Sequence, residues 1–331
     1  MSLSLRELVS LAGRFLSQII PLPSVIGKSC FFSQFHSGNV TPYEPLSGAP
    51  SCPIGGPLSC HNSTPVSDDS CCFVYPGGRM LLAQFWDRKV LADGAEEDWT
   101  LHGLWPDLCD GTYDQFCRTV PRYSNITEIL SRYGHGRDGS PLIRFMNRYW
   151  LADSGPNSRL WQHEFNKHAT CINTLSPRCY RRGGSSGGHQ YQPGMEAVDY
   201  FARAASLFRM LDTYRALHAA GILPSAGRRY PLSDVQGALE KYSGGKVVLR
   251  CNGGSGGDGD GDGHEQGHGD GSEAKKKGHV LHEAWYVYFV QGSLQTGEFV
   301  PAKDLGDEAD TGNCALWVWY LPKTRRAFWE L

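Results

Sequence analysis

Eleven cysteines constrain this 331-residue chain more than any other feature of its sequence. Ten of them lie between Cys52 and Cys314, and no two form the C-x-x-C pair that is typical of a structural zinc site. An even number of widely spaced cysteines favours five disulfides formed in an oxidising compartment, each stabilising the fold by roughly 2–4 kcal/mol. Cys71 and Cys72 are adjacent, so we expect them to hold one segment to two different places. Cys30 is left over and is expected to lie outside the folded unit.

The composition favours a globular protein with a sizeable core, because 40% of the residues are hydrophobic and 11% are aromatic. A formal charge of −2 argues against a permanently basic protein that clamps nucleic acid. The twelve histidines change this balance, because protonating all of them brings the charge to +10. Acidic conditions would therefore favour binding to polyanions.

The N-terminal 50 residues are expected to be a leader and a linker that precede the folded unit. Residues 8–26 are moderately apolar but are interrupted by Arg14, so they are either a weak signal peptide or a segment upstream of one. No run of 18 apolar residues occurs, so no transmembrane helix is expected. Three N-glycosylation sequons, at Asn39, Asn62 and Asn125, agree with a secretory route.

Hydrophobic periodicity predicts strands at both ends of the folded unit and helices in its middle. Expected strands cover residues 71–75, 80–86, 99–105, 247–251, 284–290 and 316–321. Expected helices cover 126–133, 142–150, 158–171, 198–220 and 233–241, the last capped by Ser233 or Asp234. This order predicts a single disulfide-stabilised α+β domain over residues 51–323, with a central antiparallel sheet and helices packed against it. Residues 324–331 are expected to form a C-terminal tail.

A segment rich in Gly, Asp, His and Lys, residues 252–278, interrupts the last third of the chain. It has too few apolar residues to bury, so we expect a disordered surface insertion. Asp258, Asp260 and Asp262 imitate the start of a calcium-binding loop, but Gly269 stands where that loop needs an acidic residue. Calcium binding is therefore not expected.

Two aromatic-rich segments carry the residues suited to chemistry: 99–106 (WTLHGLWP) and 160–171 (LWQHEFNKHATC). The His163-Glu164 pair imitates a zinc metalloprotease motif, but Lys167 stands where the second histidine ligand is needed, and His168 comes one residue later. In a helix, His163 and His168 would point about 140° apart. Metal-free acid–base chemistry fits better, with Glu164 and His168 paired at i, i+4 and His102 supplied by the other segment.

This set of residues suits a phosphodiester that carries its own nucleophile, namely RNA with its 2′-hydroxyl. One imidazole can remove a proton while another supplies one, and fixed positive groups stabilise the developing negative charge. Trp105, next to His102 in sequence, suits base stacking, worth ~1–3 kcal/mol per base.

The two segments closely resemble the active-site segments of the ribonuclease T2 family. The spacing of the cysteines and the sequences at 76–78 (PGG), 84–87 (QFWD) and 292–297 (GSLQTG) resemble those of the fungal branch. The resemblance covers residues 52–323 apart from the insertion. It implies the ribonuclease T2 fold and a metal-independent endoribonuclease of low base specificity that needs no cofactor. The products would be 2′,3′-cyclic phosphates and then 3′-phosphates.

The resemblance also implies roles for five catalytic residues. His102 would act as general acid on the leaving 5′-oxygen, and His168 as general base on the 2′-hydroxyl. His163 would hold the phosphate, while Glu164 and Lys167 would stabilise the pentacoordinate transition state.

The family's main base pocket corresponds to Trp105, Asp107 and Tyr113, and Gln84 corresponds to a residue of the second base pocket. The chain departs from the family at Phe165, usually Trp, and at Ala169, usually Gly, where an added methyl would cost stability if the backbone needed a positive φ. Leu160 also stands where an aromatic is common. The implied disulfides are Cys52–Cys71, Cys60–Cys109, Cys72–Cys179, Cys117–Cys171 and Cys251–Cys314.

The sequence therefore predicts a secreted or vacuolar, glycosylated, monomeric enzyme that turns over single-stranded RNA at acidic pH, with no obligate protein partner and no membrane association. An alternative is a catalytically weak, RNA-binding or cytotoxic secreted effector of the same fold. A third hypothesis, a lectin-like or structural secreted domain, predicts no RNA turnover.

Overall fold

The structure, a computed structural model, describes residues 49–50, 52–53, 55–61, 71–91, 94–133, 140–181, 191–253, 278–305 and 312–324. The chain divides into two compact units, Met1–Val40 and Thr41–Leu331, and every described residue belongs to the second. The expected leader, Cys30, the sequons at Asn39 and Asn62, residues 254–277 of the insertion and residues 325–331 of the tail lie outside the described residues.

The described residues form a seven-stranded sheet in the order β2-β1-β5-β7-β3, with β4 and β6 also paired to β5. Every pair is antiparallel except β5 and β7, which run parallel, so the expected antiparallel sheet is confirmed apart from this one pair. The expected strand at 71–75 is absent, whereas β3 and β6 were not expected. The strands are β1 (Arg79–Phe85), β2 (Thr100–Asp107), β3 (Arg229–Pro231), β4 (Val247–Asn252), β5 (Gly278–Gln291), β6 (Glu298–Pro301) and β7 (Cys314–Trp319).

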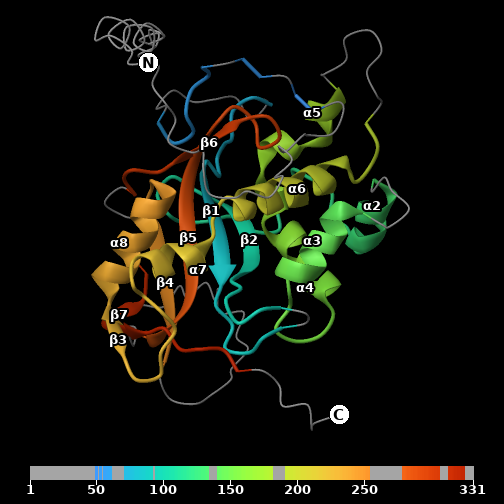
Figure 1. The fold of residues 1–331 in the computed structure, drawn as a ribbon. Helices are drawn as coiled ribbons and strands as arrows, with labels where there is room; N and C mark the ends of the chain where they lie inside the picture. Colours follow the sequence, from blue (N-terminus) through green and yellow to red (C-terminus); the bar gives the residue numbers. More distant parts are fainter. Residues whose placement is uncertain are drawn as a thin grey trace, which may run out of the picture. The chain divides into compact units, whose positions relative to one another are not determined.

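Helices contact the sheet at both of its ends. In Figure 1, α2, α3, α4 and α6 gather on the right of the central strands, and α8 lies on the left. Helix α6 contacts β1 and β2, and α8 contacts β3, β4 and β7. No helix in the described part of the chain is long and apolar enough to cross a membrane. The α-helices are α2 (Ile126–Arg132), α3 (Pro141–Tyr149), α4 (Asn157–Lys167), α5 (Pro177–Arg181), α6 (Met195–Arg209), α7 (Thr213–Ala219) and α8 (Leu232–Ser243), with 3₁₀ turns η1 (Ala169–Cys171) and η2 (Asn173–Leu175).

Two helix predictions need correction. The helix expected over 198–220 is two helices, because the Asp212 side chain accepts a hydrogen bond from the Arg215 N–H and starts a new helix at Thr213. Helix α8 begins after Pro231 without a side-chain cap, so neither Ser233 nor Asp234 is its N-cap.

Both faces of β1 and β5 are buried, and each face has its own apolar cluster. On the helix face, Met80 and Leu82 of β1 join the main core. On the opposite face, Leu81 and Ala83 pack with Trp105, Trp285 and other residues in a second, smaller cluster. Alternation along a strand sends successive side chains to opposite faces. We call this second side the site face, because the residues considered below lie on it.

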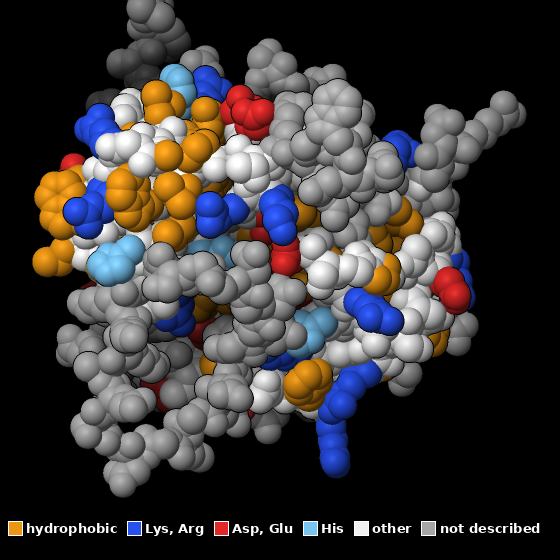
Figure 2. All heavy atoms as spheres, turned by 90° about the horizontal axis from the view of Figure 1, so that it is seen from below, with side chains coloured by type: hydrophobic (Ala, Val, Ile, Leu, Met, Phe, Trp, Pro, Cys, Tyr) orange, Lys and Arg blue, Asp and Glu red, His pale blue; other side chains and the backbone are white. Residues whose placement is uncertain are grey.

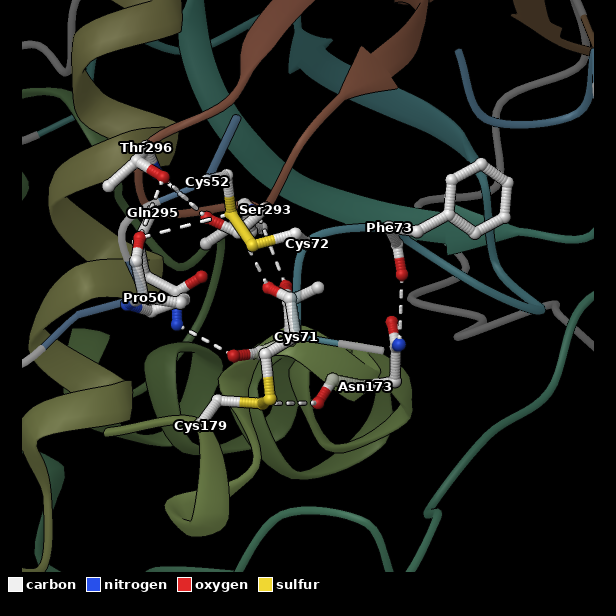
Figure 3. Close-up of a disulfide and its surroundings, with 12 residues drawn as sticks. Pro50, Cys52, Cys71, Cys72, Phe73, Asn173, Cys179, Ser293, Gln295 and Thr296 are labelled. Atoms are coloured by element: carbon white, nitrogen blue, oxygen red, sulfur yellow. Dashed lines mark hydrogen bonds between the residues drawn. A yellow bond between two sulfur atoms is a disulfide. The ribbon is translucent and has the colours of Figure 1, made fainter. Parts of the chain in front are cut away.

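Cys71 and Cys72 anchor their segment at two separate places, but not by the expected partners. The structure contains Cys52–Cys72 and Cys71–Cys179 in place of Cys52–Cys71 and Cys72–Cys179. Adjacent side chains point in opposite directions, so Cys71 faces α5 while Cys72 faces Cys52 (Figure 3). The expected Cys60–Cys109, Cys117–Cys171 and Cys251–Cys314 bridges are confirmed.

Residues 71–75 are not a strand because a side chain takes the place of a partner strand. The Asn173 amide accepts a hydrogen bond from the Tyr75 N–H at 3.0 Å and donates one to the Phe73 carbonyl at 3.0 Å. Figure 3 shows this amide facing Phe73, close to the Cys71–Cys179 bridge. The disulfide attaches the segment to α5, and the asparagine attaches it to η2.

Candidate active site

The two motif segments form β2 and α4, which lie next to each other. Strand β2 is at one edge of the sheet, so its outward backbone groups have no neighbouring strand among the described residues. Tyr200 of α6 covers part of this edge, because its hydroxyl donates to the Leu104 carbonyl at 3.0 Å. The Cys117–Cys171 bridge then ties the loop after β2 to η1, directly after α4. These contacts hold the edge strand and the helix at a fixed separation.

His102 reaches the site face because β2 contains a β-bulge. Ala83 pairs with Gly103, but the next residue of β1 pairs with Leu101, so His102 is the extra residue. Without the bulge, alternation from Trp105 would turn the His102 side chain toward the helices. The His102 carbonyl, which the bulge removes from the ladder, accepts a hydrogen bond from Trp150 Nε1 at 2.6 Å.

Helix α4 buries its apolar side and carries the polar residues next to β2. Trp161 and Phe165, one turn apart, are in the main core. Glu164 is 0% exposed and Lys167 only 7%, whereas His163 is half-buried. A buried carboxylate and a buried lysine are uncommon unless they interact with charged groups. Their burial here therefore points to a functional cluster.

His168 lies beyond the end of α4, and this changes its expected position. The helix ends at Lys167, and His168 is its C-cap residue with φ −106° and ψ −55°. The ring centroids of His163 and His168 are 6.5 Å apart, so the 140° separation expected for a continuous helix does not apply. The expected i, i+4 pairing of Glu164 is also replaced, because both of its carboxylate oxygens face β2.

Glu164 interacts with two residues of β2. Its Oε2 accepts a hydrogen bond from Trp105 Nε1 at 2.7 Å, and its Oε1 lies 3.5 Å from His102 Nε2. Gly103 makes this approach possible, because a Cβ there would lie 2.0 Å from Glu164 Oε2. Burial raises the pKa of the Glu164 carboxyl above its ordinary value, although His102, Trp105, His163 and Lys167 oppose the rise.

Trp105 does not have the open ring face expected of a base-stacking residue. It is 2% exposed. Its ring stacks on His168 at 5.1 Å between centroids and meets His102 edge-on at 4.7 Å. Trp285 contacts it at 5.2 Å, also edge-on. In this arrangement Trp105 separates and supports the two histidines, and base stacking on its ring stays a prediction.

His102 lies between two carboxylates, one of which the sequence did not reveal. Glu283 Oε1 is 3.5 Å from His102 Nδ1, on the opposite side of the ring from Glu164. Burial alone lowers the pKa of His102, but Glu164 and Glu283 outweigh it and the pKa is raised. No sequence pattern indicated a partner for the His282-Glu283 pair, because only the pairing of β1 with β5 brings Glu283 to β2.

The remaining expected base-binding residues lie in separate parts of the fold. Asp107 is the last residue of β2 and forms an isolated β-bridge with Tyr113. Burial and then the charge of Asp107 raise the pKa of the Tyr113 hydroxyl.

Gln84 is on the helix face and is 0% exposed. Its Oε1 accepts from Thr213 at 2.6 Å and its Nε2 donates to the Leu211 carbonyl at 3.3 Å. These contacts give Gln84 a structural role, and its contact with a base stays a prediction.

The departures at Phe165 and Ala169 are accommodated. Both are 0% exposed in the main core. Ala169 lies in a 3₁₀ turn and is not among the residues with positive φ, so its methyl group adds no backbone strain. The described residues contain no group of three or more His, Cys, Asp or Glu side chains suited to hold a metal ion.

Comparison with known proteins identifies the family to which this site belongs. Residues 77–261 match the model of the Ribonuclease T2 family. The chain is 39% identical to Ribonuclease T2 of Aspergillus oryzae over 275 residues, which are 83% of this chain and 84% of the relative. The chain belongs to the ribonuclease T2 family. It is also 39% identical to Ribonuclease Trv of Hypocrea rufa, over 82% of this chain and 98% of that protein.

The fold of this ribonuclease T2 family member agrees with a solved relative. The crystal structure of Actibind, a T2 ribonuclease, matches with a TM-score of 0.63 and 35% identity. The match covers 85% of this chain and 99% of Actibind. The α+β fold expected from the sequence is therefore confirmed.

Proposed function

We propose that this ribonuclease T2 family member is a metal-independent endoribonuclease that cleaves single-stranded RNA by transesterification. The observation that carries the proposal is that His102 and His168 both contact the ring of Trp105, from β2 and from the end of α4. Two imidazoles held on one rigid group suit a reaction that removes a proton at one place and supplies one at another.

The reaction follows from the chemistry of RNA. His168 takes the proton of the 2′-hydroxyl, and the 2′-oxygen attacks the phosphorus. The bond from phosphorus to the 5′-oxygen breaks, and His102 gives its proton to that oxygen. The products are a 2′,3′-cyclic phosphate and a new 5′-hydroxyl, and water then opens the ring to a 3′-phosphate. DNA lacks the 2′-hydroxyl and cannot follow this path.

The electrostatics of His102 support its role as the acid. Because its pKa is raised, the ring is protonated over a wider pH range than an ordinary histidine. His163 would hold the phosphate, and Lys167 would stabilise the charge on the phosphoryl oxygens in the transition state. Glu164, hydrogen-bonded to Trp105, would stabilise the protonated His102. Asp107 and Tyr113 remain our proposed base-binding residues.

Figure 2 shows the lower end of the molecule, where Lys, Arg and His side chains lie on the described surface together with some Asp and Glu side chains. Protonation of the histidines supports an attraction to RNA that increases at acidic pH. We also propose that the protein is a monomer that needs no obligate protein partner, acts in a secreted or vacuolar compartment, where its five disulfides would persist, and is glycosylated. Asn125, the described sequon, is exposed before α2.

The test is digestion of single-stranded RNA at pH 5 in EDTA, with analysis of the product ends. We expect cyclic phosphate ends that convert to 3′-phosphates, and at least a 10²-fold loss of rate in His102→Ala and in His168→Ala. Cleavage that leaves 5′-phosphates, or that stops in EDTA, would overturn the proposal. RNA binding without turnover by the wild-type protein would instead favour the weak-effector alternative.

A further inference from the structure

Glu283 is a buried acidic residue beside the site to which the reaction above assigns no role. It lies in β5 and is 9% exposed. Its Oε1 is 3.5 Å from His102 Nδ1, and its Oε2 accepts a hydrogen bond from Trp285 Nε1. A carboxylate that is buried at this depth and anchored at one oxygen has little freedom to move away from the imidazole.

Strand pairing fixes this arrangement. Glu283 is directly opposite Phe85 in the antiparallel pair of β5 with β1. Phe85 in turn stacks on the His102 ring, with centroids 3.9 Å apart and 20° between the planes. The imidazole is therefore held from one face by Phe85, and its Nδ1 lies 3.5 Å from Glu283 Oε1. The bulge in β2 brings His102 to this position, so sheet register determines all three contacts.

The two carboxylates beside His102 are not equivalent. Glu164 Oε1 is 3.5 Å from Nε2 and Glu283 Oε1 is 3.5 Å from Nδ1. Within the described residues Nδ1 has no hydrogen-bond partner, so the charge of Glu283 is the interaction that this nitrogen receives. An acceptor at one ring nitrogen decides which tautomer forms and which nitrogen faces the substrate. A proton kept on Nδ1 by the nearby Glu283 anion leaves Nε2 to deliver the transferred proton.

We propose that Glu283 is a positioning residue for His102: it orients the ring through Nδ1 and stabilises its protonated form, so that Nε2 delivers the proton to the leaving 5′-oxygen. This inference rests on the proposed ribonuclease reaction and adds to it a residue outside the two motif segments. Glu283 itself touches no reacting atom.

The charges around His102 agree with this role. Lys167 of α4 opposes protonation of His102, whereas Glu164 of the same helix and Glu283 of β5 favour it. The flanking strands contribute the uncharged rings of Phe85 and Trp105.

Burial raises the pKa of the Glu283 carboxyl, but His102, His282 and Trp285 outweigh it, and the pKa is lowered. His282 Nε2 lies 3.8 Å from Glu283 Oε1, so this imidazole also favours the charged carboxylate. Glu283 is therefore ionised over the pH range in which His102 must be protonated.

The test compares Glu283→Gln with Glu298→Gln, which neutralises an exposed carboxylate of β6 in the same sheet. The pKa of His102 is followed by NMR of ¹³C-labelled histidine, with His102→Gln used to assign the signal. We expect Glu283→Gln to lower this pKa by about one unit and Glu298→Gln to leave it unchanged. Glu283→Asp, which keeps the charge on a shorter side chain, should give a smaller shift in the same direction.

Kinetics separate positioning from a general loss of structure. The basic limb of the kcat/KM profile on RNA should move down by about one pH unit in Glu283→Gln, a loss of about tenfold on that limb, with little change in KM at pH 5. A uridine 3′-(4-nitrophenyl phosphate) substrate, whose leaving group needs no protonation, should be cleaved at nearly the wild-type rate. Equal losses on both substrates would indicate a structural role and overturn the inference.

The two proposals can fail separately. An unchanged His102 pKa and an unchanged basic limb in Glu283→Gln, in a protein that still cleaves RNA, would refute the role of Glu283 alone. A wild-type protein that does not cleave RNA, but whose His102 pKa falls in Glu283→Gln, would refute the ribonuclease reaction and leave the coupling of the two side chains intact.

Discussion

Replacing Trp105 with Phe tests whether this ring supports the catalytic groups or receives a base. The substitution keeps an aromatic ring beside His168 and removes the indole N–H that donates to Glu164 Oε2 at 2.7 Å. Because Glu164 is 0% exposed, water cannot readily replace the lost donor. The perturbation therefore removes one charge-assisted hydrogen bond inside the site.

The size of the effect follows from this hydrogen bond. A hydrogen bond to a charged group contributes about 1.5–3 kcal/mol, and 1.36 kcal/mol corresponds to one pKa unit. The pKa of Glu164, already raised by burial, should rise by a further one to two units, roughly. At pH 5 the carboxylate would then be protonated more often and His102 would lose its partner. We expect kcat to fall by about 10- to 100-fold.

The assay measures kcat and KM for a dinucleoside monophosphate from pH 4 to pH 8, together with unfolding in urea. Trp161→Phe is a matched control, because Trp161 is also 2% exposed and its Nε1 donates to the neutral carbonyl of Trp150 at 2.9 Å. Both variants should be less stable than the wild type by about 1–3 kcal/mol. Only Trp105→Phe should lower kcat strongly and change the pH profile.

The opposite result would restore the interpretation made from the sequence. If Trp105→Phe raised KM and left kcat and the pH profile unchanged, the ring would act in base binding. The hydrogen bond to Glu164 would then contribute nothing to catalysis, and our account of the site would be wrong.

Three further predictions concern pH, disulfides and the second base pocket. Because the pKa of His102 is raised, its contribution to the free energy of unfolding is complete below about pH 6.5 and is lost as pH rises through the folded-state pKa. His102→Gln should flatten this part of the stability profile, measured by urea unfolding between pH 5 and pH 9. An unchanged profile would contradict the shift. Cys179→Ser should lower the free energy of unfolding by about 5 kcal/mol, given a sequence separation of 108. Alkylation with tandem mass spectrometry should find the freed thiol at Cys71, and a label on Cys72 instead would contradict the observed pairing. Gln84→Ala should lower the melting temperature, because Thr213 and the Leu211 carbonyl lose their hydrogen bonds to Gln84. The KM for dinucleotides should stay the same. A raised KM in a variant of unchanged stability would place this residue in the second base pocket.

The sequence predicted the chemistry of the site because the reactive residues are clustered in two short segments. The side chains His102, Glu164 and Lys167 all lie within or beside hydrophobic positions with a clear period, so their strand and helix were expected correctly. Most element boundaries agreed for the same reason. The exception at 198–220 arose because the cap at Asp212 is a local hydrogen bond that does not disturb the hydrophobic pattern.

The sequence was least informative where the direction of a side chain mattered. Trp105 and Gln84 were expected to meet a base, yet one is enclosed by aromatic rings and the other faces the helices. Cys71 and Cys72 were assigned to each other's partners. In each case the residue type was informative, but a shift of one position along an extended chain reverses the face on which a side chain lies.

The sequence by itself determined the class of fold, the family and the set of reactive groups, because these depend on residue types and on spacings along the chain. The tertiary structure alone decided that a bulge turns His102 toward Trp105 and that β5 brings Glu283 to Nδ1. Glu283 is far from His102 in sequence, and only hydrogen-bond register between strands makes them neighbours. Register depends on the packing of the whole sheet, which no local pattern contains.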